Sequence, residues 1–298
     1  MVLEVRKPAR SIIEVENGFG HSTNKDARAL LCKIWYDRPM SEPIERCIWC
    51  LKLIRKGSEE HVLPDALGCP PHLVLGVGVC MACNNGLGHV DQALIRQFEI
   101  LAFVHGVRRK KGRAPAIHMW APIKGRYVEG KPEIHLNAGP QVVESNGRRL
   151  TAASPANGIT DVVFDTPGAG EEATVGFRQE LGREPKLARA LLKVALGSVA
   201  LNWGLSLARD SRFDPVRAFV RKGVGDFDIL LTQGRPGCSH HVSAPMLRPG
   251  DELPLVEITL FGIGFVVDTD PAQAGLAVLR RAFEQDGGVP WMILPKAA

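Results

Sequence analysis

The chain of 298 residues lacks any apolar run that would cross a membrane. The longest uncharged stretch of its C-terminal helix region, Val194–Ala208, is shorter than the ~20 residues that a spanning helix needs. Internal repeats and low-complexity segments are also missing, so the chain after residue 114 is expected to form one accessory domain. A secretory leader is not recognisable, and we therefore expect a cytoplasmic protein without a membrane partner.

Cysteine and charge usage point to metal binding and to a polyanionic partner. Seven cysteines are present, and four of them form two Cys-x-x-Cys pairs, which in a reducing compartment favours metal ligation over disulfides. The net charge of +5 and the isoelectric point near 8.9 suit a polyanion. With 45% hydrophobic residues the chain can bury a full core, and its length predicts about two domains.

The two pairs are Cys47/Cys50 and Cys80/Cys83. A gap of two residues lets a tight turn aim both thiolates of a pair at one ion, and two such knuckles complete a tetrahedral four-cysteine site. The spacing therefore predicts one structural zinc ion.

The residues between and after the knuckles predict the order strand, strand, helix. An acid and a histidine, Glu60 and His61, open the segment that ends at Pro64, and the apolar segment Leu73–Val79 reads as a second short strand. From Met81 onward, apolar residues recur at helical spacing. These residues are Leu87, Val90, Leu94 and Phe98.

The nested pattern C-x-x-C, E-H-x-x-P, G, C-x-x-C-N resembles the four-cysteine, zinc-knuckle subgroup of the HNH (ββα-metal) endonucleases. It is carried here by Cys47, Cys50, Glu60, His61, Pro64, Gly68, Cys80, Cys83 and Asn84. The resemblance implies an α+β chain with a zinc-stapled ββα-metal, treble-clef-like nuclease domain and a larger α+β accessory domain.

The resemblance also implies a role for three residues. His61 would be the general base that takes a proton from the attacking water, which suits an imidazole that titrates near neutral pH. Glu60 and Asn84 would hold one catalytic divalent cation, Mg²⁺ or Mn²⁺, through oxygen. The neighbouring Asn85 is an alternative to Asn84 as the ligand, or else caps the helix.

Two positions depart from the family pattern. The asparagine that usually lies before the second strand has no counterpart between His61 and Cys80. Cys69 stands where many relatives have a second glycine, and it is either a spare thiol or an alternative zinc ligand.

Positive charge is concentrated just after the predicted helix, because no acid occurs between residues 105 and 126. This segment is either a surface that tracks a phosphate backbone or a solvated linker. The candidate nucleic-acid-binding residues are Arg108, Arg109, Lys110, Lys111 and Arg113.

The pattern divides the chain into four predicted parts. Residues 1–44 form an N-terminal helical extension with a helix from about Asn24 to Tyr36, 45–104 the nuclease domain, 105–126 a basic linker and 127–298 the accessory domain. The accessory domain begins with short apolar runs separated by turn residues, which from Ala114 to about Gly182 predict a meandering antiparallel sheet.

Further elements are predicted downstream of that sheet. An amphipathic helix over Glu184–Trp203 places Lys193 on its polar face. A short basic helix begins at Asp214-Pro215, and its Arg217, Arg221 and Lys222 contact phosphates or solvent. A buried strand over Leu255–Asp268 and a helix over Pro271–Gln285 follow.

Three functions are compatible with these patterns. The first is a divalent-metal-dependent endonuclease that hydrolyses phosphodiester bonds in nucleic acid, with DNA favoured over RNA. The second is a zinc-dependent nucleic-acid-binding module without catalysis. The third is a regulated defence effector in which the accessory domain senses a ligand. A substitution of His61 separates the first from the second.

Overall fold

A computed structural model describes the chain in separate segments, and the helix expected from Asn24 to Tyr36 lies outside them. The described residues are 2–4, 45–108, 112, 117–120, 123–128, 131–136, 143–145, 149–151, 159–165, 174–182, 184–233, 240–243, 254–286 and 290–296. Within them helices and sheets are mixed, so the α+β class is confirmed.

The predicted order strand, strand, helix is present near the cysteines. Strand β2 (Glu60–His61) pairs antiparallel with β3 (Val74–Leu75), and helix α2 (Met81–Val104) follows. The second strand is shorter than predicted. The residues before β3 form the 3-10 turn η2 (Pro71–Leu73), where Pro71 at the start of the turn offers no N–H to a ladder. A further 3-10 turn, η1 (Asp65–Leu67), connects β2 to η2.

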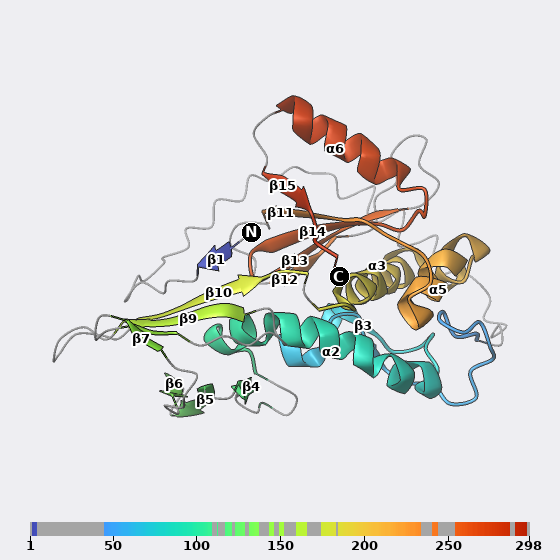
Figure 1. The fold of residues 1–298 in the computed structure, drawn as a ribbon. Coiled ribbons are helices and arrows are strands. Elements are labelled where there is room, and N and C mark those ends of the chain that lie inside the picture. The colour runs from blue at the N-terminus through green and yellow to red at the C-terminus, as the bar shows by residue number, and fades with distance from the viewer. Residues whose placement is uncertain are drawn as a thin grey trace, which may run out of the picture.

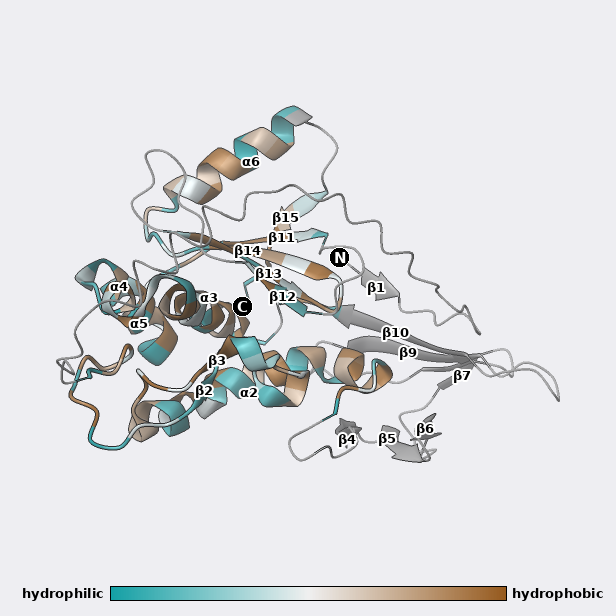
Figure 2. Ribbon diagram, turned by 180° about the vertical axis from the view of Figure 1, so that it is seen from behind, coloured by the Kyte–Doolittle hydropathy of each residue, from teal (hydrophilic) through white to brown (hydrophobic). Residues whose placement is uncertain are grey.

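Helix α2 packs against helix α3 (Leu187–Trp203), and the two lie side by side in Figure 1. The predicted apolar stripe of α2 is buried, with Val90 and Phe98 fully enclosed. Helix α3 is buried on almost all sides from Ala190 to Ala200, so it is not the one-sided amphipathic helix that was expected. In Figure 2 it is coloured as hydrophobic along most of its length.

A five-stranded antiparallel sheet, in the order β12-β13-β14-β11-β15, covers α3. Its strands are β11 (Ile229–Gln233), β12 (His240–Val242), β13 (Leu255–Leu260), β14 (Ile263–Asp268) and β15 (Trp291–Ile293). Helix α6 (Ala274–Asp286) lies on the other side of this sheet from α3 (Figure 1).

The single strand expected over Leu255–Asp268 is a hairpin, so that prediction is wrong. Strands β13 and β14 pair along their full length from Leu255 with Asp268 to Leu260 with Ile263. The two residues between them, Phe261 and Gly262, have φ of 51° and 82°. Two consecutive positive φ values are what a tight hairpin loop requires, and a glycine within an apolar run was the available signal.

Two short helices connect α3 to the sheet. They are α4 (Leu205–Ala208) and α5 (Asp214–Lys222), with the 3-10 turn η5 (Ser211–Phe213) between them. Helix α5 packs against α3 and begins where the sequence predicted, with a proline in its first turn.

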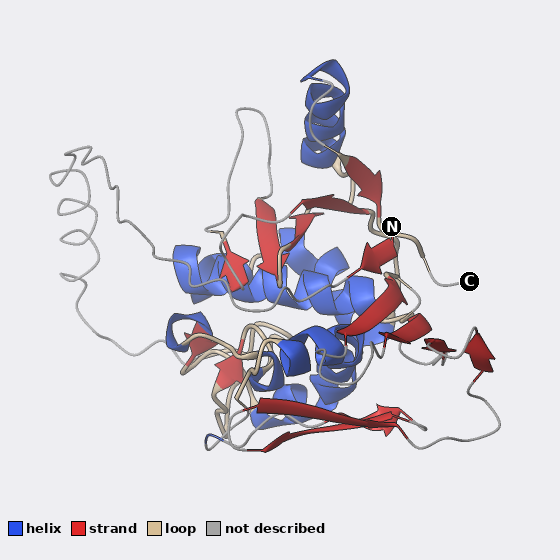
Figure 3. Cartoon of the chain, turned by 90° about the vertical axis from the view of Figure 1, so that its left-hand side faces the viewer, coloured by secondary structure: helices blue, strands red, loops and turns tan. Residues whose placement is uncertain are grey.

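The middle of the chain forms antiparallel meanders, but in two sheets where one was predicted, with the orders β4-β5-β6 and β1-β10-β9-β8-β7, and the N-terminal strand β1 joins the second. The strands are β1 (Val2–Glu4), β4 (Ile117–Trp120), β5 (Ile123–Val128), β6 (Lys131–Leu136), β7 (Val143–Ser145), β8 (Arg149–Thr151), β9 (Ile159–Asp165) and β10 (Thr174–Glu180). Apart from α6, the helices lie between strands above and below them in Figure 3.

One apolar cluster runs through the described core, from Trp49 beside the first cysteine pair, through α2 and α3, to Phe265 of the C-terminal sheet. The predicted domain boundaries stay a prediction. Among the described residues, no helix combines the length and the apolar character that a bilayer span requires.

Candidate metal centre and nuclease site

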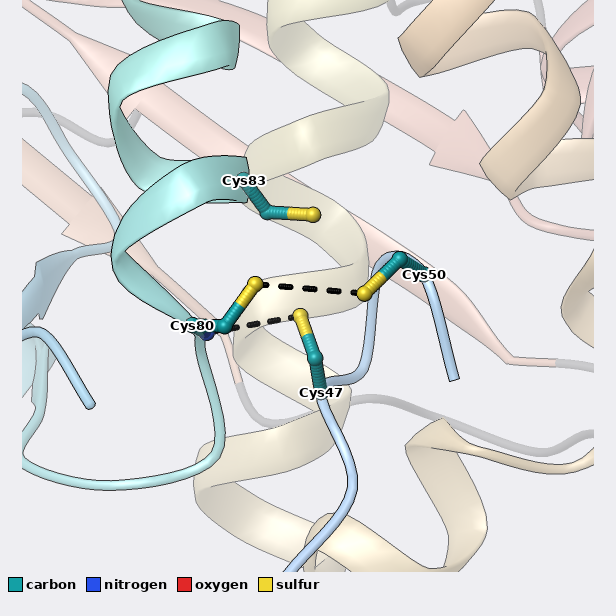
Figure 4. Close-up of side chains that lie close together, drawn as sticks. All are labelled: Cys47, Cys50, Cys80 and Cys83. Carbon is teal, nitrogen blue, oxygen red and sulfur yellow. Dashed lines mark hydrogen bonds between the residues drawn. The ribbon is translucent and has the colours of Figure 1, made fainter. Parts of the chain in front are cut away.

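The four cysteines of the two pairs come together, as predicted. Cys47 and Cys50 lie on the loop before β2, Cys80 is the residue that precedes α2, and Cys83 lies in the first turn of α2 (Figure 4). Their sulfur atoms all lie within 4.8 Å of one another, and they are the one such group of His, Cys, Asp and Glu side chains found in the described residues.

The spacing of the sulfur atoms suits a tetrahedral zinc ion. With Zn–S bonds of ~2.3 Å, two sulfurs of a tetrahedron lie ~3.8 Å apart. The Cys50 and Cys80 sulfurs are 3.8 Å apart. The backbone N–H groups of Trp49 and Cys80 both donate to the Cys47 sulfur at 3.4 Å, which favours a thiolate there.

The knuckle turn is closed by the backbone. Leu51 N–H donates to Cys47 O, and Cys47 N–H donates to Lys52 O, each at 2.9 Å. Leu51 has a φ of 58°, a left-handed conformation that a residue with a side chain adopts only under constraint. Coordination of both thiolates by one ion would supply that constraint.

Charge also argues for a cation between the thiols. Burial raises the pKa of the Cys47 thiol, and burial together with the Cys47 charge raises that of Cys83. Burial alone would raise the pKa of Cys80 too, but hydrogen bonds from Cys83 and the other thiols lower it. Because four adjacent thiols cannot all ionise without a counter-charge, the donor set fits a zinc ion.

Cys69 is not part of this cluster, so its role as an alternative zinc ligand is not supported. Its thiol donates to Leu73 O at 3.5 Å and to Pro70 O at 3.6 Å. Burial raises its pKa to about 11, which makes the thiol a poor ligand and a poor nucleophile.

Glu60 is buried and paired with a lysine from α3. The residue is 3% exposed, and its Oε1 forms an ion pair with Lys193, which is itself 2% exposed. Lys193 Nζ also lies 2.8 Å from Asp91 Oδ1 on α2. The second carboxylate oxygen of Glu60 is buried without a hydrogen-bond partner. Asp91 therefore serves as a second ion-pair partner of Lys193.

The net charge of this triad explains the direction of its pKa values. Burial raises the pKa of Glu60, and Lys193 only partly offsets that effect. Burial alone would lower the pKa of Lys193, but Asp91 and Glu60 together raise it. One cation shared by two carboxylates leaves the triad with one net negative charge. Glu60, the more buried of the two acids, therefore keeps its proton to higher pH.

Helix α3 supports β2 at two matched positions. Lys193 and Gly197 lie one helical turn apart, on the same face of α3, while Glu60 in β2 and Val62 just after it lie two residues apart and both face α3. Lys193 contacts Glu60, and a Cβ at Gly197 would lie 2.9 Å from Val62 Cγ2, closer than real Cβ contacts. The absence of a side chain at Gly197 is what lets the strand approach the helix.

His61 lies between these two positions on the strand, so its side chain points away from α3. The residue is partly exposed, in contrast to Glu60 and Val62 on either side. The described residues provide no hydrogen bond to its imidazole, which is therefore available to a water molecule or a phosphate.

Asn84 lies in the first turn of α2 and holds the loop that leads to Glu60. Its amide nitrogen donates to Ser58 Oγ and to Glu59 O at 3.0 Å. With the nitrogen committed to the loop, the amide oxygen is the atom left for a cation. Asn85, the alternative ligand, is exposed on the same turn.

The residues present do not fit a divalent cation between Glu60 and Asn84 in this arrangement. The Lys193 ammonium is in direct contact with the Glu60 carboxylate, and it would repel a divalent cation bound there, in a site of low dielectric constant. The Asn84 oxygen fits such an ion, whereas Glu60 would fit only if Lys193 left it.

The predicted basic segment lies largely outside the described residues. Arg108 is exposed beyond the C-terminal end of α2, whereas Arg109, Lys110, Lys111 and Arg113 are not described. Among other predicted residues, Arg217 is buried and donates to Ala208 O, Asp210 O and Asp214, so its assignment to phosphate or solvent is wrong.

Lys193 is the residue that the sequence pattern missed at this site, because it was assigned to a solvated helix face. A signal for its burial was present. It lies in the run Leu191-Leu192-Lys193-Val194-Ala195, and a lone cation in an all-apolar stretch of helix is expected to be paired. Its partners, which lie more than a hundred residues earlier, could not be read from that run.

The chain matches no protein-family model, no curated protein and no solved structure.

Proposed function

We propose that the chain is an endonuclease of the HNH type, which hydrolyses phosphodiester bonds in nucleic acid, with DNA favoured over RNA. The observation that carries the proposal is the arrangement around β2. An acid and a histidine lie on a short strand paired with β3, and the helix that follows begins at two clustered cysteines and at Asn84, whose amide bonds the loop before Glu60.

His61 is the residue to which we assign the chemistry. Its imidazole accepts a proton from a water molecule as that water attacks the phosphorus, and the bond from phosphorus to the leaving oxygen breaks. The opposite face of β2 is fixed by Lys193 and Gly197, which limits the movement of the strand and thus of the imidazole. Fixing the base in this way lowers the entropic part of the barrier.

The catalytic cation that the resemblance assigns to Glu60 and Asn84 remains part of the proposal only through Asn84. When bound, Mg²⁺ or Mn²⁺ supplies charge stabilisation to the phosphate oxygens. Because the Lys193 ammonium forms an ion pair with the Glu60 carboxylate, no catalytic step is assigned to a cation held by Glu60.

The test compares the parent with His61→Ala on plasmid DNA, single-stranded DNA and RNA, with Mg²⁺, Mn²⁺ or neither. Loss of a general base is expected to slow cleavage ~100–10,000-fold while zinc content and folding stay unchanged, because His61 is outside the cysteine cluster. His72→Ala is the matched control, since His72 is an exposed histidine of the same segment. Equal cleavage rates for the parent and His61→Ala would overturn the proposal.

A non-catalytic nucleic-acid-binding module is the second candidate, and the ion pair between Glu60 and Lys193 favours it. A carboxylate buried against a lysine has a structural role without any catalytic metal. This candidate predicts that the parent binds nucleic acid but shows no metal-dependent cleavage of any of the three substrates.

A further inference from the structure

Unpaired positive charge surrounds the cysteine cluster. Four cations lie on the loop that carries the first cysteine pair, and two more end helix α5. We call these six residues the knuckle surface: Arg46, Lys52, Arg55, Lys56, Arg221 and Lys222. All six are exposed, and none forms an ion pair with a carboxylate of the described residues.

The loop and α5 meet directly, although more than 150 residues separate them in sequence. Arg221 Nη1 donates to Trp49 O at 3.3 Å. A groove of about 170 Å³ lies between the two segments, lined by Trp49 and Leu51 on one side and by Ala218, Arg221 and Lys222 on the other. The rest of the Arg221 guanidinium has no partner among the described residues and remains able to donate.

The polar groups of this groove favour an anion. Asp214, the one carboxylate in its lining, is already paired with Arg217 at 2.7 Å. A phosphate oxygen would be attracted by the free cations and could accept from the remaining N–H groups of the exposed Arg221.

The unpaired state of these cations distinguishes them from others in the molecule. Lys193, Arg96 and Lys296 each form an ion pair with a carboxylate. A zinc ion with four thiolates carries two negative charges, which balance at most two of the six cations. The remainder face solvent, and unpaired cations clustered in this way attract a polyanion.

The knuckle surface is also within reach of the proposed base. Lys56 lies five positions before His61, and an extended chain spans at most ~3.6 Å per residue, so their Cα atoms lie within about 18 Å. One strand of DNA places a phosphate every ~3.4 Å along the axis, so a strand at His61 reaches Lys56 within about five nucleotides.

We infer that the knuckle surface binds the phosphate backbone of a nucleic acid, and that this contact directs a strand to His61. The inference rests on the proposed function for its second half. The contact is made through charge and backbone phosphates, so it does not depend on base sequence.

The surface lies far from Arg108, the one described residue among the basic candidates that the sequence singled out. Helix α2 has 24 residues and is thus roughly 36 Å long, with the cysteines at its first turn and Arg108 beyond its last. The two regions are therefore separable by experiment.

The experiment measures binding of labelled duplex DNA against salt concentration, in a His61→Ala background that prevents cleavage. Lys52→Gln/Arg55→Gln/Lys56→Gln is compared with Arg108→Gln/Lys110→Gln/Lys111→Gln, which removes the same net charge. Three lost phosphate contacts make the log–log salt slope shallower by roughly 2.7, and we expect this for the first triple variant. Lys222→Gln alone should make it shallower by roughly 0.9, which tests the contribution of α5.

The possible outcomes separate the surface from the proposed function. If the His61→Ala parent binds no nucleic acid, the proposed function fails, and the inference with it. If the parent binds DNA but the first triple variant keeps its slope, the surface is wrong and the proposed function stands. Anionic phospholipid vesicles that bind with the same dependence on the knuckle surface would overturn the choice of nucleic acid as partner.

Each variant is checked for zinc content. If the triple variant loses zinc, the salt slope of the single variant Lys52→Gln is measured in its place, because Lys52 is exposed. This single variant should make the slope shallower by roughly 0.9 while the zinc stays bound, and an unchanged slope would overturn the surface.

Discussion

The segment around the cysteines and the C-terminal sheet are stabilised by different means. In the first, β2 and β3 pair through only two residues each, and the chain around them is mostly turns. In the second, β13 and β14 pair through six residues each and bury nearly every side chain between α3 and α6. Where ladder hydrogen bonds are few, a cluster of four cysteines that could hold a metal ion lies beside the strands and, once loaded, would replace them.

The largest expected effect is the loss of the metal. Small structural zinc sites contribute ~10–16 kcal/mol of apparent binding free energy, which is also folding free energy. Chelation, or Cys80→Ser, should therefore unfold residues 45–83 while the sheet of β11 to β15 remains protected from hydrogen exchange. Exchange measured by mass spectrometry separates the two segments.

Cys69→Ser is the control for that substitution, because Cys69 lies outside the cluster. It should leave zinc content unchanged. Protection lost equally in both segments on zinc removal would contradict the contrast between them.

A smaller effect is expected at the contact between the first region and α3, the helix that the C-terminal sheet covers. Lys193→Met leaves the buried Glu60 carboxylate without its cation, and breaking a buried pair from one side typically costs ~3–5 kcal/mol. The double variant Glu60→Gln/Lys193→Met removes both charges and should recover a large part of that loss. Urea unfolding of the parent, both single variants and the double variant measures the coupling. Additive effects would show that the contact does not join the regions energetically.

The smallest expected effect is a pH dependence of the free energy of unfolding, which originates at Glu60. Burial raises the pKa of this carboxyl in the folded chain, so the folded state binds its proton more tightly than the unfolded state does. The resulting stability is present below the ordinary pKa of a glutamate and is lost as pH rises through the raised value. Glu60→Gln should remove this decrease in the free energy of unfolding between acid and neutral pH. If Glu60→Gln leaves the decrease unaltered, another group causes it.

The local part of the site could be predicted from the sequence, because its signals are short in range. Knuckle spacing brings Cys47, Cys50, Cys80 and Cys83 together, and helical spacing gives α2. The environment of Glu60 could not be predicted, because its partner Lys193 is set by how α3 packs on β2. Whether His61 and Asn84 act in catalysis stays a prediction.

The same limit applies to α5 and to the hairpin of β13 and β14. The basic residues of α5 divide into buried Arg217 and exposed Arg221, and only the packing of α5 on its neighbours decides which is which. The hairpin was missed because apolar character continues through its turn at Phe261, whose φ of 51° is not a typical value for that residue.

The close approach at Gly197 means that the cysteine-stapled segment cannot be transplanted freely. A chimera that joins it to a foreign helix must supply a cation and, four residues later, a position without a side chain, in the order that Lys193 and Gly197 have here. The segment therefore packs only on a helix that carries a lysine and, four residues later, a glycine. A recipient helix with alanine in place of this glycine would push Val62, and His61 beside it, away from their present positions.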